Sequence, residues 1–167
     1  MIRFSYEHVF RAASPMVLLT AFTDPTHVAA QDRVGQVASR EVIERRDAPE
    51  SYYCDSRIVP SRQLPAFVRP LVRGGLEYTE RLRWDRSTDT LVIEVRPAIL
   101  GGRASVDARC QIVDHAPGEV RRIYSGTVTV EVALIGGRVE RSIATEIGRA
   151  LTVAAVTTQA WLDARAA

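Results

Sequence analysis

Residues 120–165, VRRIYSGTVTVEVALIGGRVERSIATEIGRALTVAAVTTQAWLDAR, decide the fold of this chain of 167 residues. Val120–Leu134 alternates apolar and polar residues, which predicts a strand with one buried face. Ile135-Gly136-Gly137 leads into Arg138–Arg165, where apolar residues recur at helical spacing. A helix of that length spans roughly 40 Å, enough to cross a small sheet. A twisted sheet closed over such a helix encloses either a packed core or a cavity.

The remainder of the chain predicts one α+β domain over residues 1–167, since no Pro- or Ser-rich linker divides it. A first strand through Ile2 to Arg11 precedes two short helices, Met16–Phe22 and a second ending near Arg33. Five further strands are predicted before the last one: Gly35–Arg46, Ser51–Val59, Leu76–Asp85, Thr90–Arg96 and Arg103–Asp114. Hairpin-length turns between them make the seven-stranded sheet antiparallel.

This layout resembles the START-like, or helix-grip, superfamily typified by the birch pollen allergen. The resemblance rests on the aromatic first strand, the Asp24-Pro25 break and the Ile135–Glu140 entry to the last helix. It is closest to a bacterial family of unknown function within that group. It implies a curved antiparallel sheet gripping the C-terminal helix, with a hydrophobic cavity between them. Members bind lipids, sterols, polyketides or plant hormones, some are cyclases or dehydratases, and no active-site motif is shared by all.

Composition excludes several classes of function. A net charge of +2 gives no basic field for dedicated nucleic-acid binding. No apolar run reaches the roughly 18 residues of a membrane span. Cys54, Cys110 and three dispersed histidines have no metal-ligand spacing, so we expect neither a metal nor another cofactor. Two buried free thiols and the lack of a signal sequence favour the cytoplasm. We expect the chain to be a monomer or a homodimer.

The first strand presents one aromatic face, on which Tyr6, His8 and Phe10 are candidate ligand contacts. An imidazole there suits a general base or a hydrogen bond to a ligand's polar group. The alternative is a histidine satisfied by a backbone carbonyl or lying near the sheet edge.

Two later strands add candidates on their apolar faces. Tyr78 shares its face with Glu80, a carboxylate that needs a solvated mouth or an ion pair, for which Arg96, Arg109 and Arg122 are the partners on facing strands.

In the last strand Tyr124 offers a hydroxyl at the end of an apolar ring, and Gly126 indicates a bulge, a bend or room for a ligand.

The terminal helix has small residues in the middle of its apolar stripe. Ile147, Ala150 and Ala154 belong to this stripe, where alanines leave volume that a bound molecule or a closely approaching sheet would occupy. Between Pro60 and Gly75, Phe67 and Leu71 lie at helical spacing among arginines. This segment suits a gate over the cavity that touches a membrane transiently, or a lid packed on the sheet.

These features favour non-covalent binding of a small hydrophobic or amphipathic molecule over catalysis. A cyclase- or dehydratase-like enzyme is the first alternative, with Glu80, Glu146 or His8 as acid or base, and it requires two such groups to converge. A protein partner that uses the convex sheet face or the lid is the second, and a large exposed apolar patch would support it.

Overall fold

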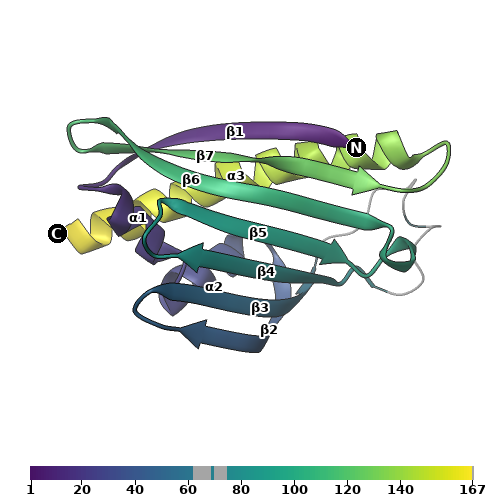
Figure 1. The fold of residues 1–167 in the computed structure, drawn as a ribbon, viewed down its shortest axis with the longest axis horizontal. Helices are drawn as coiled ribbons and strands as arrows, with labels where there is room; N and C mark the ends of the chain where they lie inside the picture. The colour runs from purple at the N-terminus through teal and green to yellow at the C-terminus, as the bar shows by residue number, and fades with distance from the viewer. Residues whose placement is uncertain (62–68, 70–74, 167) are drawn as a thin grey trace.

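The computed structural model describes residues 1–61, 69 and 75–166, which build one curved antiparallel sheet and a long helix (Figure 1). The elements in chain order are β1 (Ile2–Arg11), α1 (Pro15–Ala21), α2 (Pro25–Val34), β2 (Val37–Asp47), β3 (Ser51–Pro60), β4 (Tyr78–Asp85), β5 (Thr90–Pro97), the 3₁₀ turn η2 (Leu100–Gly102), β6 (Ala104–Ala116), β7 (Glu119–Val130) and α3 (Gly136–Ala166).

The seven strands lie in the order β1-β7-β6-β5-β4-β3-β2. Each hairpin-length turn predicted from the sequence joins two neighbouring strands. The last strand of the chain, β7, also pairs with the first, β1. This is the predicted helix-grip fold, and it is confirmed.

The last strand ends earlier than its alternation predicts. β7 stops at Val130, whose backbone N–H donates to the buried Glu140 carboxylate at 2.9 Å instead of to another strand. A turn follows in which Leu134 has a φ of +67° and a fully exposed side chain. The prediction of a strand up to Leu134 was therefore wrong, because the chain turns after Glu131: the Gly136 N–H donates back to the carbonyl oxygen of Val132 at 2.9 Å, and α3 begins.

The long helix α3 packs along β1 and β7, and Figure 1 shows it running beside these two strands. Tyr6 of β1 sets the contact: its hydroxyl donates to the carbonyl oxygen of Ala144 at 2.7 Å. One helical turn later, a Cβ on Gly148 would lie 2.6 Å from the Tyr6 ring. A glycine is therefore needed at residue 148 for the helix to approach the sheet this closely.

Helix α2 packs against both α3 and β2. His27, which is 4% exposed, lies 3.0 Å from the Thr158 hydroxyl and 3.0 Å from the Gln31 amide nitrogen. Gln31 also donates to the carbonyl oxygen of Ala154 at 3.1 Å. This buried polar contact aligns the two helices, and burial lowers the pKa of His27.

The edge strand β2 is irregular. Its register with β3 shifts twice, between Val37 and Ser39 and again between Val42 and Glu44. Such bulges bend a strand and increase its local twist.

We predict that Gly148→Ala lowers the free energy of unfolding by about 1–3 kcal/mol, since the added methyl group displaces the packed Tyr6 ring. Gly137→Ala is the matched control, because a Cβ there meets only Arg141 Nη1 at 3.8 Å. The control should be neutral or stabilising by up to about 1 kcal/mol, as expected for alanine in a helix. Urea denaturation measures both variants, and equal effects would contradict this role of Gly148.

We also predict that the folded state loses stability as the pH falls below about 6.5, the ordinary value for histidine. Burial lowers the folded-state pKa of His27, and burial followed by the Arg122 charge lowers the pKa of His8. The unfolded chain therefore binds more protons in this range, and stability declines as the pH falls through it. Urea midpoints at about pH 7.5 and 5.5 should differ less in His27→Gln than in the wild type or in a variant of the exposed His115.

Candidate functional site

The inner face of the sheet is largely apolar. Register places Tyr124, Cys110, Leu91 and Trp84 in one row across four neighbouring strands, and the last three are fully buried. The inward faces predicted for β4 and for β7 up to Val130 are therefore confirmed. The polar side chains that interrupt this face are the candidates for a site.

Glu80 of β4 lies in a cluster of three charges. Its Oε1 accepts from Arg40 Nη1 of β2 at 3.0 Å. The Nε of Arg40 donates to Asp32 of α2 at 2.8 Å, and all three side chains are mostly buried. Burial disfavours the Arg40 charge, but the bonds to Asp32 and Glu80 outweigh it and raise the Arg40 pKa. The predicted ion pair of Glu80 is present, whereas its expected partners Arg96, Arg109 and Arg122 were wrong.

Tyr78 and Tyr124 flank this cluster on the inner face. Burial, and then the charge of Glu80, raises the pKa of Tyr78 to about 12 and also raises that of Tyr124. Both phenols are therefore protonated at neutral pH and able to donate. Both side chains are half-buried, and neither hydroxyl forms a hydrogen bond within residues 1–61, 69 and 75–166. Two donors and a carboxylate thus face the apolar interior together.

The aromatic face of β1 is present as predicted, but its members differ in what they contact. Phe4 stacks between Tyr6 and Tyr124, with ring centroids 5.9 and 6.0 Å away. The Tyr6 hydroxyl is already hydrogen-bonded to the Ala144 carbonyl oxygen of α3. Phe10 is buried, and the guanidinium carbon of Arg122 lies 5.0 Å from the centre of its ring.

Arg122 of β7 joins β1 to α3 through neutral groups. Its Nη2 lies 3.2 Å from Nδ1 of His8, the residue opposite it in β1, and 3.1 Å from the carbonyl oxygen of Leu151. Because Arg122 holds this nitrogen, His8 is tied to a cation rather than to the backbone carbonyl considered from the sequence.

Gly126 is explained by the neighbouring strand. A Cβ at this position would lie 2.3 Å from the carbonyl oxygen of Asp107 and 2.8 Å from Ala108 Cα, both in β6. The close approach of two strands accounts for this glycine, so the alternative of space for a ligand is not supported.

The buried stripe of α3 is rotated from the predicted one. Its buried middle residues are Ala144 and Gly148, whereas Ile147, Ala150 and Ala154 are half-buried. The backbone of Ala154 faces α2, where it accepts from Gln31. Sequence periodicity follows large apolar side chains, but the closest contact with the sheet requires small ones. Phe67 and Leu71 lie outside the described residues.

The three candidate acid–base groups do not pair with one another. Glu80 binds Arg40, His8 binds Arg122, and the exposed Glu146 binds Arg149 at 2.6 Å one helical turn away. A catalytic pair would have to converge on one substrate atom. The described residues therefore give the cyclase alternative no support.

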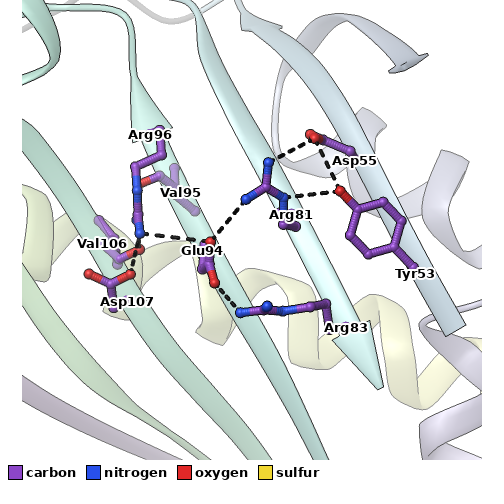
Figure 2. A network of polar contacts seen from close by, with 9 residues as sticks. All are labelled: Tyr53, Asp55, Arg81, Arg83, Glu94, Val95, Arg96, Val106 and Asp107. Atoms are coloured by element: carbon purple, nitrogen blue, oxygen red, sulfur yellow. Dashed lines mark hydrogen bonds and ion pairs between the residues drawn. The ribbon is translucent and has the colours of Figure 1, made fainter. Parts of the chain in front are cut away.

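The outer face of the sheet carries a network of cross-strand ion pairs, which Figure 2 shows across β3 to β6. Glu94 contacts Arg81, Arg83 and Arg96. The network extends to Asp55 at 3.2 Å from Arg81 and to Asp107 at 2.6 Å from Arg96. Covering this face would remove many charges from water. It is suited to solvent rather than to an apolar protein partner.

A surface hollow of about 380 Å³ lies around the β6–β7 turn, between Asp114 and Glu119 and beside Ala12 and Ala13. None of the ten ligand-contact candidates that lie within the described residues lines it. Among the described residues, no helix is long and apolar enough to cross a membrane.

The sequence did not point to Arg40 or Asp32, and it offered Arg122 only as a partner for Glu80. Asp32 and Arg40 are 8 positions apart in the chain, and Arg40 and Glu80 are 40 positions apart. A basic residue on an inward strand position is the signal that identifies Arg40 and Arg122.

Solved structures share this fold at low sequence identity. The protein TTHA0849 from Thermus thermophilus matches with a TM-score of 0.68 at 13% identity, over 99% of this chain and 100% of that one. The Zhui aromatase/cyclase from Streptomyces sp. R1128 gives 0.68 at 7%, over 99% and 96%. A START superfamily protein from Mycobacterium smegmatis gives 0.61 at 11%, over 96% and 97%. The chain has a START-like helix-grip fold.

No curated protein sequence matches the chain. A family model does match, and it covers residues 5–162. The chain therefore belongs to the family described as "Protein of unknown function (DUF2505)".

Proposed function

We propose that this protein binds a small hydrophobic or amphipathic molecule, without forming a covalent bond, between the inner sheet face and the helices. The observation that carries the proposal is the pair of half-buried tyrosines on the inner sheet face, Tyr78 and Tyr124, whose hydroxyls form no hydrogen bond within the described part of the chain. A tyrosine combines an apolar ring with a hydroxyl that suits a contact with the polar group of a ligand. A ligand with one polar group and an apolar body would satisfy them and bury its remainder against the apolar rows.

Two further observations support this proposal. Glu80 lies close enough to both hydroxyls for its charge to raise their pKa values. Its carboxylate and the two hydroxyls therefore provide one acceptor and two donors that could orient one end of a ligand. The fold is shared with a protein whose name is aromatase/cyclase and with a START superfamily protein. These likenesses concern the fold, and the polar groups come from this chain alone.

The direct test is binding of N-phenyl-1-naphthylamine, an uncharged dye that fluoresces in apolar surroundings. We expect saturable binding, and Leu82→Trp should weaken it about tenfold, or ~1.4 kcal/mol, because it adds bulk to the inner face of β4. The control Arg83→Trp adds the same bulk on the outer face of that strand. Native mass spectrometry of gently purified protein should show a bound organic molecule. Absence of both a bound mass and dye binding would contradict the proposal.

A second prediction separates hydroxyls that serve the fold from those available to a ligand. Tyr6→Phe removes the bond to Ala144 and should lower the free energy of unfolding by about 1 kcal/mol. Tyr124→Phe removes a hydroxyl with no partner among the described residues and should change it by less than about 0.5 kcal/mol. Chemical denaturation of both variants checks the contrast. A loss in Tyr124→Phe as large as in Tyr6→Phe would show that its hydroxyl already has a structural partner.

A further inference from the structure

Arg122 is a buried cation without a counter-charge among the described residues. Its side chain is 3% exposed and lies on the inward face of β7. The partners of its Nη2 are a histidine nitrogen and a backbone carbonyl, both neutral. Its Nε–H is buried and has no hydrogen-bond partner in the described part of the chain. No carboxylate there lies within ion-pair distance of this guanidinium, in contrast to Arg40 with its two carboxylates.

Within the described residues, the surroundings of Arg122 offer no anion. The acidic groups close enough to influence it are the Cys110 thiol and the Tyr124 phenol. Burial raises the pKa of the Cys110 thiol to about 12 and raises that of Tyr124, so both are neutral at physiological pH. Residues 62–74 contain arginines but neither aspartate nor glutamate. Burying a charge without a partner is costly, and proteins normally pair it or bind a counter-ion there.

We propose that Arg122 is the anchor for the anionic group of the bound molecule, which makes the ligand a hydrophobic organic anion such as a carboxylate on an apolar body. This inference rests on the function proposed above and names the chemical class of the ligand. Arginine presents several N–H donors in a plane that matches an oxyanion, and a charge-assisted bond in a dry interior is strong.

The distribution of charge orients such a ligand. Phe10 lies against the guanidinium, and Tyr124, two residues along β7, continues the same inward face towards the field of Glu80. An anion is attracted at Arg122 and repelled near Glu80. The charged end of the ligand therefore lies beside β1 and α3, and an uncharged polar group lies beside Tyr78 and Tyr124.

The test compares two dyes with one aromatic skeleton. 8-Anilinonaphthalene-1-sulfonate carries a sulfonate, and N-phenyl-1-naphthylamine lacks it. We expect the wild type to bind the sulfonate dye at least about tenfold more tightly, which corresponds to ~1.4 kcal/mol. Arg122→Met should remove that preference and still bind the uncharged dye. Arg121→Met is the matched control, because Arg121 is the adjacent residue, faces outward and pairs with Glu7 at 3.6 Å.

Each outcome decides the inference. Equal affinities of the wild type for the two dyes would overturn the anion site and leave the proposed function standing. A preference that survives in Arg122→Met, or disappears in Arg121→Met, would also overturn it. Failure of both dyes to bind the wild type would overturn both proposals.

If Arg122→Met does not fold by circular dichroism, competition in the wild type decides the question. Octanoate should displace the sulfonate dye at concentrations at least about tenfold lower than octanol, which has the same chain without the charge. Equal displacement by the two compounds would overturn the anion site.

Discussion

The contact between Tyr6 and α3 determines how the helix lies on the sheet. The ring occupies the space that a side chain on residue 148 would need, and the hydroxyl is held by the Ala144 carbonyl. Together they fix the height and the position of the helix along β1. The same placement brings the Leu151 carbonyl within reach of Arg122, while α2 meets β2 at the opposite edge of the sheet. The polar groups of the interior are positioned as a consequence of this contact.

Much of the fold follows from local patterns in the sequence. Alternation identified the inward faces of β1, β4 and β7, because a strand with one buried face must place its apolar residues two apart. Turn residues marked the hairpins, and the antiparallel order followed from their lengths. The end of β7 was predicted too late because Val132 and Leu134 continue the alternation. In the structure the N–H of Val130 donates to the side chain of Glu140 in α3. A competing partner from another element is not visible in a local pattern.

The candidate site was predictable in its residue types but less so in its pairings. Tyr78, Glu80 and Tyr124 were identified because polar groups on apolar strand faces are unusual. The Arg40 partner of Glu80 comes from β2, two strands away in the sheet, and depends on its curvature. The face of α3 that packs on the sheet was also predicted wrongly from apolar periodicity. The most closely packed positions carry Ala144 and Gly148, and such small residues add little to that periodicity. The interior therefore has one end with excess negative charge and another with an isolated cation, as far as the described residues extend.

The irregular strand β2 has a consequence for the behaviour of the protein in concentrated solution. A sheet that does not close into a barrel leaves its outermost strand with unpaired backbone groups, which are a template for a strand of another molecule. The two register shifts and the terminal charges Arg45, Arg46 and Asp47 interrupt that template despite the exposed Val42 and Ile43. The bulges thus protect an open sheet against edge-to-edge aggregation.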